Sequence, residues 1–306
     1  MSGLDRLSAV LEQFPVQARL HHAGPLCGNT WFDPVPGRAF LHLLRRGTLR
    51  VVHDGREGEP SRLECVEPTL LFYPRALGHR FETAPRDGAD FTCAAVFFAG
   101  GDGHPIARAL PPVVAVPLAA IRGLEGTLEL LFAEAAQTRC GSRLLVDRLF
   151  EVLVVQLLRW LLDQQPATVG LVAGLGDRRL ARALTAVHEA PCAEWTVERL
   201  AEVAGMSRSA FAAHFHAVVG LTPADYVAEW RITRACRLLR EGKPLATVAD
   251  LVGYSGYAAL SRAFRRRRGL SPREWRRAHA EAPGRVPEPG PRSWIEHKRH
   301  YAKSGA

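Results

Sequence analysis

Paired cysteine motifs are absent from the sequence. Its six cysteines are scattered and no two of them form a C-x-x-C unit; they lie at positions 27, 65, 93, 140, 192 and 236. This spacing argues against a zinc ribbon and against a disulfide scaffold. The thiols are therefore expected to be reduced, as is usual in the cytoplasm.

Long hydrophobic runs are absent as well. The first six residues lack the apolar core of a signal peptide. The most apolar stretch, Leu144 to Leu162, is interrupted by Asp147, Arg148, Glu151 and Arg159, so it does not have the pattern of a membrane span. We therefore expect a cytoplasmic protein with no membrane partner.

Catalytic motifs are also missing. The sequence contains no P-loop and no nucleophile elbow, and the glycine-rich stretch from Leu171 to Gly176 does not follow a predicted strand, as a dinucleotide fingerprint would. His214 and His216 stand two residues apart on a predicted helix, so their rings point in different directions and do not form a metal pair. We predict no catalytic residue, no metal and no cofactor, and hence no enzyme.

Excess basic charge is confined to one half of the chain. Residues 1–176 carry 17 Lys and Arg against 18 Asp and Glu, whereas residues 177–306 carry 23 against 13. A basic domain joined to a neutral one indicates that the basic half binds a polyanion and that the other half has a different task. The length of 306 residues and the 47% hydrophobic content are sufficient for two domains with buried cores.

The basic half contains an internal repeat. Residues 201–207 align with residues 249–255 at an offset of 48, and beyond that point the offset is 49, so that Phe211 and Phe215 align with Leu260 and Phe264. Each copy has the pattern of a short amphipathic helix, a turn containing glycine and a second helix opened by serine. This pattern is typical of the helix-turn-helix, whose second helix lies in a DNA major groove.

The repeat resembles the AraC/XylS family of bacterial transcription regulators. The resemblance rests on the pair of units, their A-x-x-x-G turns, the Phe-x-x-x-Phe spacing and the two G-L-T/S-P endings. It implies sequence-specific binding of double-stranded DNA and, if the protein is an activator, contact with RNA polymerase. The alternative is a helical core repeat with no nucleic-acid role, which would require two correctly spaced copies to arise by chance.

The second helix of each unit has a core face and a groove face. Phe211 and Phe215 in the first unit, and Leu260 and Phe264 in the second, are apolar and should face the core. The residues opposite form the groove face, which includes His216. The candidate base contacts are Arg208, Ser209, Ala212 and Ala213 in the first unit, and Tyr257, Ala258, Ser261 and Arg262 in the second. Arg262 is the strongest of these, because arginine offers a bidentate fork to guanine.

A second set of residues is expected to contact phosphates. It consists of Arg231 on the helix between the units and the run of Arg265, Arg266, Arg267 and Arg268 at the end of the second unit's helix. Such contacts give affinity and salt dependence rather than specificity. For Arg231 a solvated helix face is an equal alternative. The connecting helix, residues 222–240, should hold the recognition helices about one DNA turn apart.

The neutral half is predicted to consist mainly of β-strands. After an amphipathic helix that ends near Phe14, short apolar runs broken by turn residues between positions 16 and 100 indicate a β-sandwich or small barrel. Two helices, roughly 122–137 and 142–164, should follow. The predicted fold class is α+β and multidomain, with this β-domain and its helices followed by an all-α domain of two helix-turn-helix units.

The β-domain resembles the cupin-like sensor domain, of the cupin_6 type, that precedes the DNA-binding part in many members of the family. The resemblance rests on the turn at residues 46–48 and on residues 71–74 and 78–81. The chain is expected to divide into five segments: a sensor (1–104), a helical segment (105–166), a glycine-containing linker (167–176), the DNA-binding domain (177–280) and a proline-containing disordered tail (281–306). The helical segment either pairs two subunits into a homodimer or is buried against its own β-domain.

The sensor has four candidate residues. Cys27-Gly28 before a tryptophan, together with Cys93, resembles a subgroup of cupin-bearing regulators linked to oxidant sensing. This resemblance implies control by oxidation of Cys27 and Cys93, or by a disulfide between them, although an unpaired cysteine is often simply a small buried hydrophobe. A small-molecule effector in the barrel is the other possible signal.

His42 and His79 could meet inside the barrel and hold a soft metal. However, the sequence lacks the close pair of histidines with a carboxylate that cupin-type metal sites use, so one pocket histidine and one packing histidine are favoured. The competing function is a cupin-type metal-dependent enzyme with an appended nucleic-acid-binding domain. Tightly held, near-stoichiometric metal in the purified protein would favour that alternative.

Overall fold

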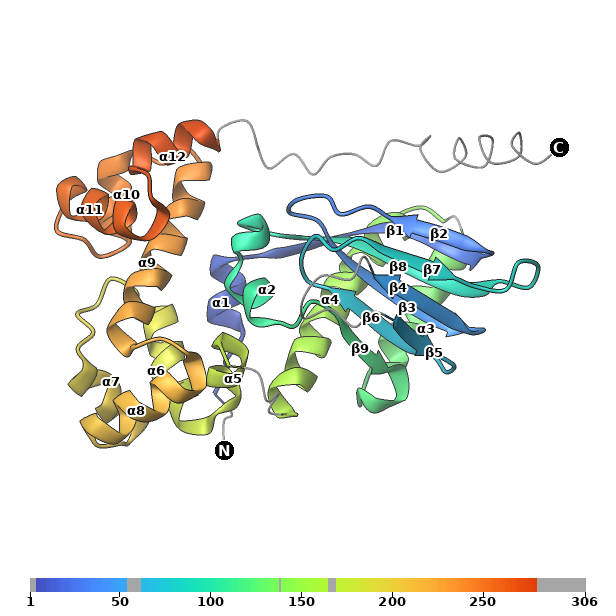
Figure 1. The fold of residues 1–306 in the computed structure, drawn as a ribbon, viewed down its shortest axis with the longest axis horizontal. Coiled ribbons are helices and arrows are strands. Elements are labelled where there is room, and N and C mark those ends of the chain that lie inside the picture. The colour runs from blue at the N-terminus through green and yellow to red at the C-terminus, as the bar shows by residue number, and fades with distance from the viewer. Residues whose placement is uncertain (1–3, 54–61, 138, 165–168, 280–306) are drawn as a thin grey trace.

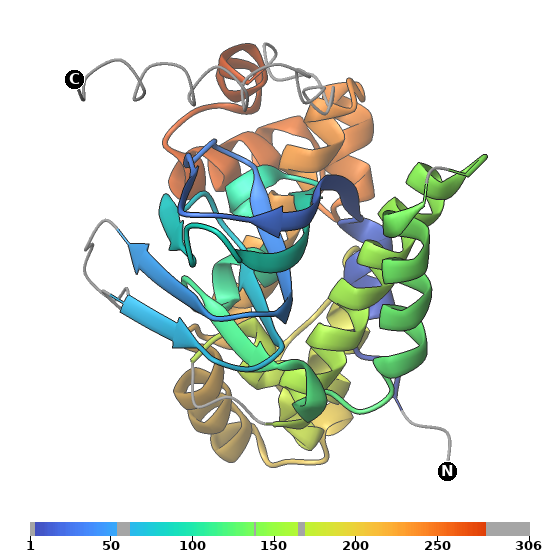
Figure 2. The same ribbon diagram turned by 90° about the vertical axis from the view of Figure 1, so that its right-hand side faces the viewer.

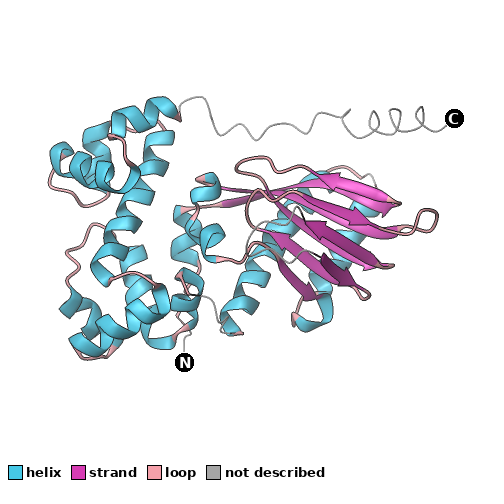
Figure 3. Ribbon diagram, in the orientation of Figure 1, coloured by secondary structure: helices cyan, strands magenta, loops and turns pink. Residues whose placement is uncertain are grey.

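A computed structural model of the chain describes residues 4–53, 62–137, 139–164 and 169–279. A body that contains the strands and a body made of helices lie side by side, with α1, α2 and α5 between them (Figure 1). Over the described residues, all strands lie in the N-terminal body (Figure 3). The predicted fold class is therefore confirmed. No helix within the described ranges is both long and apolar enough to cross a membrane.

The N-terminal body is built on two antiparallel sheets. Their strand orders are β1-β8-β3-β6-β9 and β2-β7-β4-β5. The strands are β1 Val16–Leu26, β2 Asn29–Phe32, β3 Ala39–Arg46, β4 Leu49–His53, β5 Arg62–Cys65, β6 Thr69–Tyr73, β7 His79–Glu82, β8 Ala89–Phe98 and β9 Val114–Pro117.

Strand β3 explains the layering of this body. Successive side chains of a strand point to opposite faces of its sheet. Phe40 and Leu44 accordingly join the core between the two sheets, whereas Leu41 and Leu43 join a core that includes the helices on the outer face. Because both faces are covered, β3 is apolar almost throughout, and all its residues from Ala39 to Leu44 are buried.

Helices α3 (Glu125–Ala136) and α4 (Ser142–Asp163) form the outer layer, side by side along the strands (Figure 2). Two carboxylates of α4 accept backbone N–H groups of the edge strand β1: Asp147 from Leu20 at 2.6 Å and Glu151 from Ala18 at 3.2 Å. These bonds satisfy edge donors that would otherwise be open to another strand. The N-cap residue of α4 is Gly141.

The second part of the predicted linker is a helix. Leu171–Gly176 form α5, and Leu171, Val172 and Leu175 are buried in the core shared with α4 and with the helices that follow. The glycines serve close packing: a Cβ on Gly174 would lie 2.7 Å from Leu184 Cδ1. Residues 167 and 168, like the tail at 281–306, lie outside the described residues.

The helical body contains two helix-turn-helix units joined by the long helix α9. Its helices are α6 Arg178–Glu189, α7 Val197–Ala204, α8 Arg208–Val219, α9 Pro223–Arg240, α10 Leu245–Leu251, α11 Tyr257–Arg268 and α12 Pro272–Ala278. The first unit shares its hydrophobic core with the outer layer of the N-terminal body, whereas the second unit has a separate core built around Ile232, Phe264 and Trp275.

The two bodies meet around Trp230 of α9. The Phe14 ring, at the end of α1 (Ser8–Gln13), lies 5.2 Å from the Trp230 ring and perpendicular to it within about 20°. His188 stacks on Trp230 at 4.0 Å, and its Nε2 lies 2.6 Å from the Tyr226 hydroxyl. Gln13 donates a hydrogen bond to the His188 carbonyl. The N-terminal body is thereby packed directly on the helix that joins the two units.

Candidate nucleic-acid interface

The first helix-turn-helix unit is fixed by local capping. The Thr196 hydroxyl accepts the Arg199 N–H at 3.2 Å at the start of α7, and the Ser207 hydroxyl accepts the Ala210 N–H at 3.4 Å at the start of α8. Gly205 ends α7 with φ 67°, a left-handed conformation that only glycine adopts without strain. Gly205 and Ser207 together therefore fix the sharp turn between α7 and α8.

The recognition helix α8 exposes most of its predicted groove face. Phe211 and Phe215 are buried as expected, and Arg208, Ser209, Ala213 and His216 are exposed, whereas Ala212 is half-buried beside the core face. The exposed Ala210 and Ala217 extend this face and were not predicted, because alanine carries little signal for either side of a helix. Arg208 pairs with Glu198 of α7 at 2.6 Å.

The recognition helix α11 presents a more polar face. Leu260 and Phe264 are buried, and Tyr257, Ala258 and Arg262 are exposed, while Ser261 is half-buried. An exposed arginine in the middle of such a helix can reach the N7 and O6 acceptors of guanine. Arg262 is therefore exposed on the groove face of α11, as a base contact requires.

The four-arginine run is divided between two sides of α11. Arg267 pairs with Asp225 of α9 at 2.8 Å, and Arg268 pairs with Glu229 of α9 at 2.6 Å. Arg265 and Arg266 are exposed, and Arg265 lies 3.3 Å from Glu274 of α12. Four consecutive residues span most of a helix circumference, so they cannot share one face. The expectation of four phosphate contacts is reduced to Arg265 and Arg266.

Arg231 donates hydrogen bonds within the protein instead of facing solvent. Its guanidinium is half-buried and donates from Nε to the Pro191 carbonyl and from a terminal nitrogen to the Ala193 carbonyl, both at 2.8 Å. These bonds tie α9 to the connection between α6 and α7. Neither predicted role, a phosphate contact or a solvated helix face, agrees with this geometry.

Helix α9 sets the separation of the two recognition helices. It spans 18 residues, which corresponds to about 27 Å at the usual helical rise. Thr222 caps its start, where its hydroxyl accepts the Asp225 N–H at 3.1 Å, and Pro223 occupies the first turn. A single rigid element of this length can present α8 and α11 to successive major grooves.

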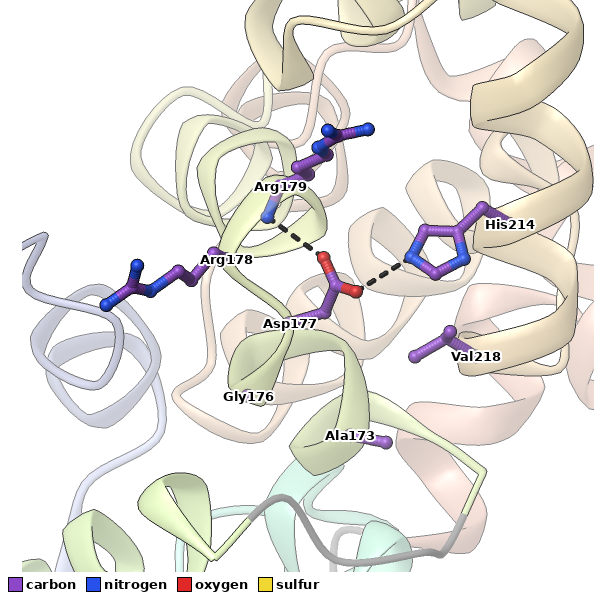
Figure 4. A pocket seen from close by; sticks show the side chains of 7 residues that line it. All are labelled: Ala173, Gly176, Asp177, Arg178, Arg179, His214 and Val218. Carbon is purple, nitrogen blue, oxygen red and sulfur yellow. Dashed lines mark hydrogen bonds and ion pairs between the residues drawn. The ribbon is translucent and has the colours of Figure 1, made fainter.

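A pocket of about 500 Å³ lies where α5, α6 and α8 meet (Figure 4). Asp177 caps α6 by accepting the N–H groups of Arg179 and Leu180, both at 2.9 Å, and pairs with His214 of α8 at 2.7 Å. Burial opposes ionisation of Asp177, but hydrogen bonds from the Leu180 N–H and from His214 hold its pKa below the usual value. The Arg178 and Arg179 guanidinium groups point away from the carboxylate (Figure 4).

The predicted sensor cysteines lie far apart. Cys27 is exposed and follows Leu26, which pairs with Ala89, whereas the buried Cys93 pairs with His22. The two cysteines are therefore separated by at least four residues along β8, or about 13 Å. A disulfide needs Cα atoms within about 7 Å, so the expectation of a direct Cys27–Cys93 bridge is wrong for this arrangement. Burial also raises the pKa of the Cys93 thiol.

The predicted sensor histidines meet between the sheets. His42 and His79 are buried, and their Nε2 atoms are 3.0 Å apart. His79 Nδ1 lies 2.9 Å from the Leu77 carbonyl, so it must carry a proton, and the His79 Nε2 then accepts from His42. Over the described residues, no group of three or more His, Cys, Asp and Glu side chains is placed to hold a metal ion.

Burial of neutral histidines predicts a loss of stability in mild acid. Burial lowers the pKa of His79 and of His188 to about 3, against about 6.5 in the unfolded chain. Below pH 6.5 the unfolded state therefore binds more protons than the folded state, and each of these histidines lowers the free energy of unfolding by about 1.4 kcal/mol per pH unit.

Urea unfolding at pH 7.5 and pH 5 measures this effect. We expect a clear loss at pH 5 and a smaller loss in His79→Gln and in His188→Gln. An unfolding free energy that does not change between these two pH values would contradict the prediction.

Comparison with known proteins agrees with both halves of the structure. Residues 5–163 match a family model described as Cupin, and residues 200–278 match one described as Helix-turn-helix domain. An AraC-like transcription regulator of Streptomyces lividans is 35% identical over 302 residues, which cover 90% of this chain and 98% of that protein. A similar regulator of Streptomyces antibioticus is also 35% identical and is covered to 99%.

The crystal structure of the DNA-binding domain of AdpA in complex with a target DNA is 32% identical in sequence, covers 35% of this chain and 99% of its own, and has a TM-score of 0.34. The resemblance predicted from the repeat and from the β-domain is confirmed. Because the Streptomyces regulators align over almost their whole length and share these two domains, this chain belongs to the AraC-like family of transcription regulators.

Proposed function

We propose that this AraC-type regulator reads duplex DNA with the exposed faces of α8 and α11, and that a signal received by the cupin domain controls how the two helices are presented. The observation that carries the proposal is the arrangement of two exposed recognition faces on one connecting helix, α9. Arg208 and Arg262 are the side chains best suited to read bases. Arg265 and Arg266 are placed to contact phosphates.

The route for the signal is supported by strand β1. Its start follows Phe14, which packs on Trp230 of α9, and its end precedes the exposed Cys27. Oxidation of Cys27 alone, or a small effector between the sheets, would shift the position of β1. Such a shift would change how Phe14 packs on Trp230. A signal of either kind thus has a short physical path to the helix that sets the spacing of the recognition helices.

Selection from a genomic fragment library tests this function. The full-length protein is mixed with the fragments, with and without a mild oxidant, and the retained DNA is sequenced. We expect one enriched motif with two half-sites about one turn apart, and an oxidant-dependent change that Cys27→Ser abolishes. Retention no better than that of random DNA in both states would reject sequence-specific regulation.

The same fold supports a homodimer through α3 and α4. Leu130, Leu144, Leu145 and Val152 are 45–61% exposed, although much of α4 is buried against its own sheet. Leu145, Leu149 and Val152 follow the i, i+4, i+7 spacing of a coiled-coil seam. A second copy of this chain is the occupant that such a self-complementary apolar stripe favours.

A charge in this stripe should separate the subunits. We expect sedimentation equilibrium to give a dimer for the unmodified protein and a monomer for Leu145→Glu combined with Val152→Glu, because two carboxylates would be buried without partners. Arg143→Gln, on another face of α4, is the control and should remain dimeric. A dimer that persists in the double variant would place the interface elsewhere.

A further inference from the structure

The two helix-turn-helix units differ sharply in charge. Residues 177–222, which contain the first unit, carry five arginines and five carboxylates. Residues 245–279, which contain the second unit, carry eight arginines and two carboxylates. Both units have the same fold and both expose a recognition helix, so the fold itself does not account for this difference in charge.

Six of the eight arginines in the second unit are exposed. Arg267 and Arg268 are occupied by Asp225 and Glu229 of α9, which leaves three arginines on α11 and three on α12: Arg262, Arg265, Arg266, Arg273, Arg276 and Arg277. No sequence pattern singled out the last three, because they follow the repeat and lie outside its recognition helix.

Helix α12 lies directly beside the groove face of α11. The Arg273 guanidinium is 5.7 Å from the centre of the Tyr257 ring at the start of α11, and Glu274 lies 3.3 Å from Arg265. Pro272 and Trp275 turn the opposite side of α12 into the core of the unit. Arg273 and Arg277, four residues apart, therefore line one exposed stripe that continues the surface of α11.

We propose that Arg265, Arg266, Arg273 and Arg277 form an anchor surface that binds the DNA backbone whatever its sequence, with α12 as its second element. The inference rests on the proposed DNA-binding function and adds to it a phosphate-binding role for α12. In this arrangement the second unit supplies nearly all of the electrostatic affinity. The first unit, which carries no net charge and shares its core with the cupin domain, adds sequence reading to that of Arg262.

Salt dependence of binding reports such contacts one by one. Each phosphate that a cation neutralises adds about 0.9 to the slope of log affinity against log salt concentration. Removing two contacts of the anchor surface should therefore lower the slope by about 1.8. The loss should be the same on a specific duplex and on a random one, because a phosphate contact carries no sequence information.

The experiment uses the full-length protein and compares two matched pairs of substitutions. The test pair is Arg273→Gln with Arg277→Gln on α12. The control pair is Arg178→Gln with Arg182→Gln on α6, which removes the same charge from two exposed arginines at the same four-residue spacing in the first unit. Affinity is measured by fluorescence anisotropy from 50 to 300 mM salt on a selected duplex and on a random duplex.

We expect the α12 pair to lower the slope by about 1.8 on both duplexes with the sequence preference unchanged, and the α6 pair to leave the slope as it is. An equal fall in both pairs, or no fall in the α12 pair, overturns the anchor surface. Failure of the unmodified protein to bind any duplex would instead reject the proposed function. Since Arg273 also lies over Tyr257, Arg277→Gln alone tests the surface without touching that ring and should lower the slope by about 0.9 on both duplexes. Circular dichroism confirms that each variant is folded.

Discussion

Replacing Trp230 by alanine is expected to lower the free energy of unfolding by about 3–5 kcal/mol. Only 2% of Trp230 is exposed, and its ring is enclosed by Phe14 of the N-terminal body and by His188 of α6. Truncation would leave a cavity lined by groups from both bodies. Neither body could close this cavity alone, because each is held by its own sheet or helix packing.

Chemical denaturation of the full-length protein, followed by circular dichroism, measures this loss. The matched control is Trp31→Ala on β2: this tryptophan is 53% exposed, and although Arg80 lies over its ring at 4.8 Å, the expected loss is below about 1 kcal/mol. Equal losses in the two variants would show that Trp230 is not a central packing element.

Replacing Arg262 by alanine is expected to weaken binding to the selected DNA site by about 1–3 kcal/mol, or roughly 5- to 150-fold. Arg262 is exposed in the middle of α11, opposite the buried Leu260 and Phe264. A bidentate contact to a base is lost only where the correct base is present. Binding to random duplex DNA should therefore weaken much less.

The control for this prediction is Arg266→Ala on the same helix. A phosphate contact should weaken binding to the selected and random duplexes alike and lower the salt slope by about 0.9. If Arg262→Ala behaved in the same way, Arg262 would be a backbone contact and the base-reading role would have to pass to another residue of α11 or α8.

The helical half was predictable because its signals are local. The helices α7, α8 and α9 begin directly after the capping residues Thr196, Ser207 and Thr222. The spacing of Phe211 and Phe215 predicted which side of α8 is buried. Capping and helical periodicity need only neighbouring residues. In the second unit, however, α11 begins after Gly256, which provides no side-chain cap, and not after the serine that the repeat predicts.

The errors share a different cause, which is contact between distant segments. The sequence predicts that Arg231 meets DNA or solvent, but the Pro191 and Ala193 carbonyls that it binds are 40 and 38 positions earlier, respectively. The glycines of residues 167–176 indicate a linker, whereas Gly174 lies in the helix α5 and makes room for Leu184. Likewise, the distance between Cys27 and Cys93 depends on the register of β1 and β8, which the sequence does not reveal.

Spacing of the two half-sites tests the central claim most directly, since α9 would hold both recognition helices of one chain in fixed register. Binding of the full-length protein is measured on the selected motif and on copies with 5 extra base pairs between the half-sites, which is roughly half a helical turn. We expect the insertion to reduce affinity to that of a duplex with a single half-site, because the second half-site moves to the opposite side of the duplex. Full affinity after the insertion, or a selected motif that contains a single half-site, would contradict it.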